Sequence, residues 1–364
     1  MASETVPIES PTSTATWSQF RGNPLLQGYA SGTLSTDLKV KWTFKAEASI
    51  KSSAVLSPTH VYFGSDDGHI YALERQTGSL SWKFTTEDIV EATPLLLNDL
   101  LIVGSSDTYM YALKAETGEL VWKFKTEDKL LGAANFTPAP TDSGNWILFG
   151  GYDDFLYCLK AESGELVWKY GLESYINGTP AIQGDLVAVG GCDSNLHIVE
   201  LKDGSPKHVV PIEQYVAGSV ALSENRAYFG HYGNQVVSVD LQKGSVDWVY
   251  QHKSFPFFSS PALAENYMVI GGRDKTLHCL NRQDGSLVWT FRTRGRIDGS
   301  PAICDGKVIA GSEDGRLYLV SLKDGKNLWS YDLGDRIQSS PAVSQGHVYI
   351  GANDGVLYAF GPKS

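Results

Sequence analysis

The chain has 364 residues, of which 42% are apolar and 37 are glycine, and its formal net charge is −11. This composition is rich in turn residues and can bury a large core. The acidic charge excludes a general nucleic-acid binder, which needs a basic surface, and disfavours adsorption to an anionic membrane. The four cysteines show no CxxC spacing and no Cys/His pair has zinc-ligand spacing, so we expect no metal site. No run of 18 apolar residues predicts a transmembrane helix.

The chain begins with a polar leader, residues 1–16, whose Ser, Thr and Pro content predicts disorder. No export signal is visible. Two interpretations stay open: a cytosolic protein, or a mature exported chain in which the leader follows a lipid-anchored cysteine. We favour the second, which places the protein in the periplasm or elsewhere outside the bacterial cytoplasm. Residues 17–37 are predicted to be an N-terminal extension that packs on the domain that follows.

Tryptophans organise the rest of the chain. Their steps are 40, 40, 46, 80, 41 and 40 residues, and His208 fills the position missing from the double step. A period of this size marks stacked supersecondary units. The tryptophans are Trp42, Trp82, Trp122, Trp168, Trp248, Trp289 and Trp329.

Each unit predicts four short strands, as residues 53–84 illustrate. An opening segment after a Ser or Thr is followed by apolar runs at 61–63 and 70–73, which flank an Asp-Asp-Gly-His turn. A second turn leads to residues 80–84, where apolar and polar residues alternate. Four strands in about 40 residues make one propeller blade. The units open at Ser53, Thr93, Thr137, Thr179, Ser219, Ser260, Ser300 and Ser340.

The last unit ends after Phe360 without a fourth strand, whereas an unpaired strand, residues 38–44, stands at the start of the repeats. Closing the ring with it would remove the exposed edges of the sheet. We therefore predict one all-β domain over residues 38–364, an eight-bladed β-propeller whose last blade is completed by the N-terminal strand. The tryptophans are predicted to dock between neighbouring blades.

The segments Ala72–Trp82 and Ala112–Trp122 resemble the tryptophan-docking motif of PQQ-type (quinoprotein) propellers, and Trp17–Asn23 resembles the leader of many bacterial PQQ-like propellers. The resemblance covers residues 38–364. It implies one of two functional classes: dehydrogenases that use PQQ and Ca²⁺ to oxidise alcohols or sugars, or non-catalytic propellers such as the BamB-like lipoproteins of outer-membrane barrel assembly. The fold alone does not choose between them.

In a propeller the first strand of each blade lines the central channel. The residue two before each opening Ser or Thr follows an apolar neighbour, and this alternation turns it towards the channel. The predicted ring is Lys51, Glu91, Asn135, Asn177, Ala217, Phe258, Asp298 and Gln338. We expect its polar members, with Arg296 and Arg336 at the rim, to form a ligand-binding channel. Glu91, Asn135 and Asp298 carry the oxygen ligands that Ca²⁺ uses, and are the Ca²⁺ and general-base candidates of the dehydrogenase alternative.

Two absences count against catalysis. The resemblance to the alcohol dehydrogenases implies a disulfide between adjacent cysteines over the quinone, and no adjacent cysteine pair exists here. Most units also keep to 40 or 41 residues, which leaves little chain to cover a cofactor. We therefore expect a non-enzymatic binding or scaffold propeller without a cofactor, a monomer that presents its loops and channel mouth to a protein or small ligand. The alternative is a PQQ- and Ca²⁺-dependent dehydrogenase. The irregular fourth and fifth units, around His208 and Gly233, indicate where a partner surface would lie.

Overall fold

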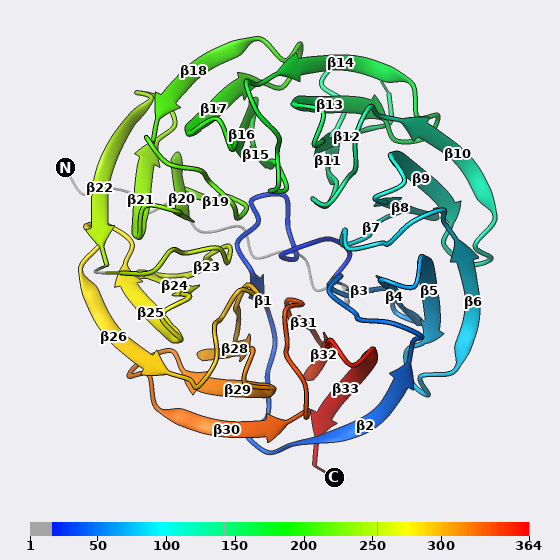
Figure 1. Cartoon of the computed structure of the whole chain (residues 1–364), viewed down its shortest axis with the longest axis vertical. Coiled ribbons are helices and arrows are strands. Elements are labelled where there is room, and N and C mark those ends of the chain that lie inside the picture. The colour runs from blue at the N-terminus through cyan, green and yellow to red at the C-terminus, as the bar shows by residue number, and fades with distance from the viewer. Residues whose placement is uncertain (1–16, 142, 253, 364) are drawn as a thin grey trace.

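The computed structural model describes residues 17–363 except 142 and 253, so the predicted leader over residues 1–16 lies outside the described residues. The described chain forms eight antiparallel sheets around a central axis (Figure 1). Every sheet contains four strands of its own, and one gains a short fifth strand from the N-terminal segment. The prediction of an all-β, eight-bladed propeller is confirmed. None of the described residues belongs to a helix of the length and apolarity needed to cross a membrane.

The blades follow one another in chain order. Blades 1 to 4 consist of β3 (Val55–Leu56), β4 (His60–Gly64), β5 (His69–Glu74) and β6 (Leu80–Thr85); β7 (Leu95–Leu97), β8 (Leu100–Gly104), β9 (Tyr109–Lys114) and β10 (Leu120–Lys125); β11 (Asn135–Pro138), β12 (Asn145–Gly150), β13 (Phe155–Lys160) and β14 (Leu166–Gly171); and β15 (Ala181–Gln183), β16 (Leu186–Gly190), β17 (Asn195–Glu200) and β18 (Pro206–Pro211).

Blades 5 to 8 complete the ring. They consist of β19 (Ala221–Ser223), β20 (Arg226–His231), β21 (Gln235–Asp240) and β22 (Ser245–Gln251); β23 (Ala262–Ala264), β24 (Tyr267–Gly271), β25 (Thr276–Asn281) and β26 (Leu287–Arg292); β27 (Ala302–Cys304), β28 (Lys307–Gly311), β29 (Arg316–Ser321) and β30 (Asn327–Asp332), with β1 (Tyr29–Ala30) beside β27; and β31 (Ala342–Ser344), β32 (His347–Gly351), β33 (Val356–Pro362) and β2 (Leu38–Lys45).

Burial within a blade follows from stacking. The second strand, such as β8, is buried along its whole length, because both faces of each blade pack against a neighbouring blade. The outermost strand, such as β10, largely alternates between exposed and half-buried residues, because successive side chains point to opposite faces and one of these faces reaches solvent. The apolar core is therefore divided among the interfaces between blades.

The ring closes as predicted, through the N-terminal strand. Strand β2 pairs antiparallel with β33, and the register brings Trp42 opposite Ala359. Figure 1 shows the blue β2 outside the red β33, which completes blade 8 from the two ends of the repeat region. Blade 8 therefore has four strands, like the other blades.

Tryptophans form most joints between blades. In six joints the indole Nε1 donates a hydrogen bond of 2.8–3.0 Å to a backbone carbonyl of the next blade. The ring lies on a glycine of that blade whose φ is 69–74°, and an added Cβ would come within 2.5–2.8 Å of the indole. Only glycine meets both demands, a positive φ and close approach. The glycines are Gly78, Gly118, Gly164, Gly204, Gly285 and Gly325.

Two joints differ from this arrangement. Between blades 4 and 5 the ring of His208 takes the indole's place on Gly244, and its Nε2 lies 2.9 Å from the carbonyl of Gln242. Between blades 7 and 8, Trp329 contacts Phe360 edge-on, with ring centroids 5.6 Å apart. The imidazole is smaller than an indole, so the joint between blades 4 and 5 buries less apolar surface.

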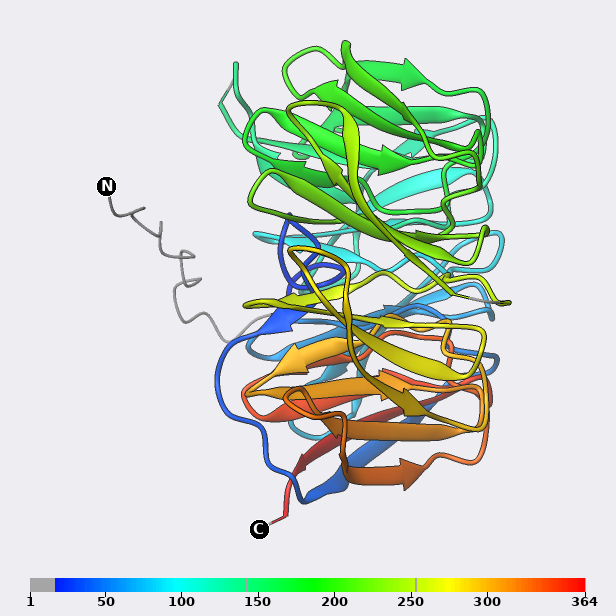
Figure 2. The ribbon, with the colours of Figure 1, turned by 90° about the vertical axis from the view of Figure 1, so that its left-hand side faces the viewer.

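The N-terminal segment crosses one face of the ring. Its carbonyls accept backbone hydrogen bonds of 2.7–2.9 Å from the innermost strands of six blades. The donors are Leu56, Leu96, Ile182, Leu222, Leu263 and Ile303. Figure 2 shows the segment, in blue, on a single face of the disc. We call residues 17–30 the plug, because they cover the channel at this face.

Arg21 anchors the plug from inside. Its side chain is 1% exposed, and Nη1 and Nη2 donate hydrogen bonds of 2.5 and 2.8 Å to the carbonyls of Pro301 and Pro261. Burial lowers the pKa of Arg21 to about 9. The guanidinium therefore stays charged at neutral pH, and its two charge-assisted hydrogen bonds join the plug to blades 6 and 7.

Candidate functional site

The channel is a cavity closed at one end. Its volume is about 190 Å³, and Phe20 of the plug lines it together with residues from all eight blades. Deeper in the cavity, the opening Ser and Thr side chains form a nearly closed circle, in which seven hydroxyls accept hydrogen bonds of 2.8–3.2 Å from the backbone N–H of the preceding blade. The circle is broken at Ala133, which has no hydroxyl. Because Phe20 of the plug lies at one end of the cavity, we take the opposite end as its entrance.

The predicted channel residues lie around the entrance of this cavity, apart from Asn135. Arg296 and Arg336 do not line the cavity; they are exposed and come two residues before Asp298 and Gln338 in the chain. The ring that lines the cavity is Lys51, Glu91, Leu131, Asn177, Ala217, Phe258, Asp298 and Gln338.

The assignment of Asn135 to the ring is wrong, and so is the opening of the third unit at Thr137. The third unit opens at Ala133, and its ring residue is Leu131. Asn135 is 0% exposed and lies on the plug side, where its Oδ1 accepts from Gln19 Nε2 at 2.9 Å. The additional residues of this unit lengthen the hairpin of β11 and β12, and so come after the opening residue rather than before it. The three Ca²⁺ candidates are therefore not brought together.

The carboxylates at the entrance are paired with cations. Lys51 Nζ lies 2.6 Å from Glu91 Oε1 and 2.9 Å from Asp66 Oδ2. Burial favours the neutral amine, but the hydrogen bonds to these carboxylates outweigh it and raise the pKa of Lys51. On the other side, Arg273 binds Asp298 through two nitrogens, with Nη2 2.7 Å from Oδ2. Both ring carboxylates are thus already engaged by a cationic side chain.

Between these two ion pairs, amides complete the polar side of the entrance. Gln338 donates to Glu313 at 3.1 Å and accepts from Asn353 at 2.9 Å. With the ion pairs and the exposed Arg296 and Arg336, they form a continuous polar arc over blades 6 to 8, 1 and 2. This arc offers both donors and acceptors to a bound group.

The opposite side of the entrance is aromatic. Tyr152 and Tyr175 are stacked with ring centroids 4.5 Å apart, and Tyr232 contacts Tyr215 and Phe258 at 5.8 and 4.4 Å. We call these five residues the aromatic arc. Tyr175, Tyr215 and Tyr232 are 37%, 50% and 43% exposed. The two arcs meet where the guanidinium of Arg273 covers the ring of Phe258 at 3.7 Å.

Sequence reasoning placed Phe258 in the ring but missed Tyr152 and Tyr232 of the aromatic arc. Tyr152 and Tyr232 come from the turn between the second and third strands, one residue before the recurrent Asp position. This turn residue donates its backbone N–H, over 2.8–3.2 Å, to the loop that enters the blade, which holds it at the entrance. The eight turn residues are Asp66, Ser106, Tyr152, Cys192, Tyr232, Arg273, Glu313 and Asn353. Seven residue types occur at these eight positions, although the Asp that follows is almost constant. That variability is the signal that would have found the turn residues.

Similar proteins support the fold. A family profile described as outer membrane protein assembly factor BamB matches residues 34–141, 111–261 and 253–364. Among solved structures, BamB from Moraxella catarrhalis is 18% identical with a TM-score of 0.75, covering 90% of this chain and 98% of that one. A europium-containing methanol dehydrogenase is 14% identical with a TM-score of 0.81, covering 95% and 98%. The quinohemoprotein alcohol dehydrogenase of Comamonas testosteroni is 12% identical with a TM-score of 0.82, covering 96% and 81%.

No curated protein sequence matches the chain. At identities this low, the similarity to both BamB and the dehydrogenases concerns the fold. The family profile, in contrast, spans the repeats from the residues before β2 to the C-terminus. The chain belongs to the family described as outer membrane protein assembly factor BamB, within the PQQ-like repeat propellers.

Proposed function

We propose that the protein is a non-catalytic binding module that docks a protein partner on the aromatic arc at the open face of the propeller. The observation that carries this proposal is the exposure of Tyr175, Tyr215 and Tyr232 side by side at a rigid entrance. Tyrosine provides a large contact area at little cost in conformational entropy and is enriched where binding energy concentrates. An exposed aromatic cluster rimmed by polar groups is typical of an interaction surface.

The polar arc supplies the orientation of the partner. Arg296 and Arg336 are exposed beside the cavity, and their backbone is held by hydrogen bonds to the turns of Glu313 and Asn353. Such rim charges contribute to partner choice and association rate more than to affinity. The family description, an assembly factor, agrees with a role through protein contacts.

The second candidate is the PQQ- and Ca²⁺-dependent dehydrogenase, which the overlap with the methanol dehydrogenase structure favours. The entrance fits it poorly. The cavity of about 190 Å³ is smaller than the ~300–1,000 Å³ of typical cofactor sites. Of its proposed Ca²⁺ ligands, Glu91 and Asp298 already bind cations, and Asn135 points into the plug side.

One pair of experiments separates the two functions. Calorimetry with PQQ and CaCl₂, followed by a dye-reduction assay with alcohols and sugars, is expected to give neither binding nor turnover. Crosslinking in extracts of the source envelope is then compared for the wild type and the double variant Tyr215→Ser/Tyr232→Ser. The proposal expects a specific crosslinked protein that the double variant loses.

The matched control is Tyr29→Ser, which removes a tyrosine of similar exposure, 43%, from the N-terminal segment. It should keep the crosslinked partner. Equal capture by the wild type and the double variant contradicts the aromatic arc as the docking site, and turnover with PQQ contradicts the non-catalytic role. We also propose that the protein is an extracytoplasmic monomer, which cell fractionation and sedimentation test directly.

A further inference from the structure

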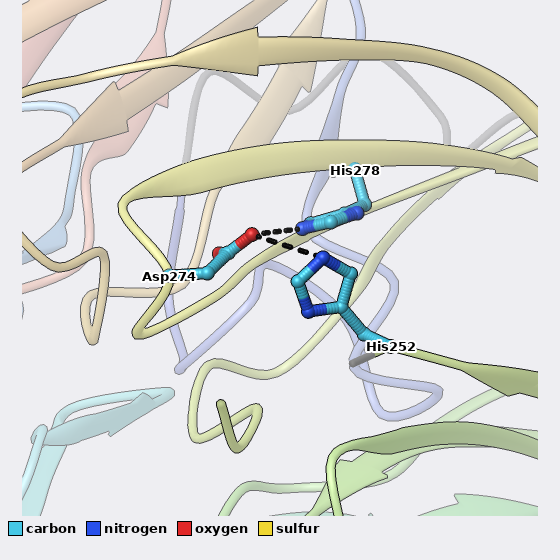
Figure 3. A group of neighbouring side chains, drawn as sticks. All are labelled: His252, Asp274 and His278. Atoms are coloured by element: carbon cyan, nitrogen blue, oxygen red, sulfur yellow. Dashed lines mark hydrogen bonds and ion pairs between the residues drawn. The ribbon is translucent and has the colours of Figure 1, made fainter. Parts of the chain in front are cut away.

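Two histidines and an aspartate converge at the joint between blades 5 and 6. His252 directly follows β22, Asp274 lies in the turn between β24 and β25, and His278 belongs to β25. Their candidate ligand atoms all lie within 4.8 Å of one another. Figure 3 shows both imidazoles directed at the same carboxylate. Among the described residues, this is the one group of three His, Cys, Asp or Glu side chains that converges in this way.

The separations match those of metal ligands. Asp274 Oδ2 lies 3.0 Å from His278 Nε2 and 3.5 Å from His252 Nε2. Ligands of a tetrahedral zinc ion at ~2.0–2.1 Å are separated by about 3.3 Å, which falls between these values. The side chains of His278, Asp274 and His252 are 1%, 10% and 27% exposed, so the group is mostly enclosed and reaches solvent through His252.

The surroundings orient the ligands. The hydroxyl of Tyr250 lies 3.1 Å from His278 Nδ1. A hydrogen bond at Nδ1 leaves Nε2 directed at Asp274, and this is how metal-binding histidines are usually held. Phe257 packs edge-on against both imidazoles, with ring centroids 5.2 Å from His278 and 6.2 Å from His252. It forms an apolar wall on the side of the group that faces the core.

Blade 4 of the same chain provides an internal comparison. There His197 Nε2 lies 2.7 Å from Asp193 Oδ2, and the hydroxyl of Tyr170 lies 3.0 Å from His197 Nδ1, as in blade 6. The position equivalent to His252 is Leu172, two residues after the tyrosine in both cases. The Tyr–His–Asp set is therefore a feature of the repeat that packing alone explains. The third ligand is what blade 6 adds.

We propose that His252, Asp274 and His278 bind Zn²⁺ with a water molecule as the fourth ligand, and that the ion ties blade 5 to blade 6. Two imidazoles and one carboxylate form a ligand set that suits zinc and related transition metals, whereas Ca²⁺ and Mg²⁺ require oxygen ligands. The ligands come from two blades. Bound metal therefore links the end of β22 to the turn that carries Arg273, a residue of the cavity entrance.

The test uses the full chain with any affinity tag removed and with metals stripped by EDTA. Calorimetric titration with ZnCl₂ should give one equivalent, and CoCl₂ should give the intense visible absorption of tetrahedral Co²⁺. Two substitutions borrow residues that the repeat itself uses at these positions: His252→Leu follows Leu172, and His278→Tyr follows Tyr318, whose hydroxyl donates to Asp314 at 2.8 Å. Both variants should remain folded by circular dichroism and lose the zinc and cobalt signals.

Two further variants separate the site from its surroundings. His197→Gln alters the equivalent set of blade 4 and should keep one equivalent of zinc at unchanged affinity. Tyr250→Phe removes the hydroxyl beside His278 and should weaken zinc binding by about 10–100-fold. The proposal is overturned if the folded wild type binds no zinc, if His252→Leu binds zinc like the wild type, or if His197→Gln abolishes binding.

Discussion

Substituting Asn135 by alanine distinguishes a residue that holds the plug from a ligand residue. In five other blades the equivalent position is alanine: Ala181, Ala221, Ala262, Ala302 and Ala342. Blade 3 should therefore accept alanine at this position. What Asn135→Ala removes is the contact with the plug, in which Asn135 binds Gln19 through Oδ1 and the carbonyls of Pro24 and Pro180 through Nδ2, over 2.8–2.9 Å.

The magnitude follows from the groups that lose their partner. The carbonyl of Pro24 still accepts from Ile182, and the N–H of Phe136, which loses its bond to Oδ1, belongs to a half-buried residue. The buried amide of Gln19 and the carbonyl of Pro180 also each lose a hydrogen bond, and these two losses set the magnitude. A buried polar group without its partner costs about 1–3 kcal/mol. We therefore expect Asn135→Ala to lower the free energy of unfolding by about 2–6 kcal/mol, measured by equilibrium unfolding in guanidinium chloride.

The control is Asn177→Ala, which removes the same side chain from the cavity ring. Asn177 is only half-buried, its neighbour in the ring is Ala217, and water in the cavity can replace its contacts. It should change stability by less than about 1 kcal/mol. Limited proteolysis should also cut the plug faster in Asn135→Ala alone. If the two variants are equally stable, or if the plug stays protected in both, Asn135 does not hold the plug.

Three further predictions concern the joints. Gly118→Ala should destabilise by about 2–5 kcal/mol in thermal unfolding, since its Cβ would meet an indole, whereas Gly184→Ala, which also has a positive φ but nothing within 4 Å, should destabilise by only about 1–2 kcal/mol. His208→Trp should stabilise the joint between blades 4 and 5 by about 0.5–1.5 kcal/mol; a lower melting temperature would contradict this. Burial raises the pKa of Asp67, but the hydrogen bonds that it accepts outweigh this and lower the pKa overall. Its contribution to stability is therefore complete above about pH 4 and lost as the pH falls through the lowered pKa, so the stability difference between the wild type and Asp67→Asn should vanish in acid.

The sequence predicts the fold because the joints repeat. At six of the eight joints a tryptophan requires a glycine on the next blade, so both residues recur with the period and mark most blades. The same reasoning failed in blade 3 for a specific reason. Thr137-Pro138 mimics the Thr-Pro that opens other units, and a 46-residue step does not reveal whether the extra residues precede or follow the opening strand. The path of the plug across the ring is also hidden from pattern analysis, because it offers one carbonyl to each of six blades and backbone carbonyls leave no trace in the sequence.

The entrance was only partly predictable because it is assembled from two loops of different blades. Tyr152 belongs to the turn within blade 3, which is bonded to Lys129 of the loop that enters that blade. Tyr175 lies in the next loop, which is bonded by the turn of Cys192 in blade 4, so the stacking of the two tyrosines depends on two separate turns. The alternation before each opening Ser or Thr predicts which side chains face the channel. It contains no information on which of them are already paired, as Glu91 and Asp298 are.

A repeat protein carries its own internal comparison, and this separates packing from binding. In the turn between the second and third strands, the Asp that follows the entrance residue accepts hydrogen bonds that join two blades, as Asp67 does from the backbone of Glu47 and from Tyr71, so packing keeps it nearly constant. The residue before it contributes only its backbone to the joint and is free to vary. Variation without packing constraint gives a scattered mixture. Turn and loop residues together nevertheless place the aromatic arc on one side of the entrance, from blade 3 to blade 6, and the polar arc on the other. That segregation is what a single asymmetric partner would produce, and it is the physical reason to look for one at this face.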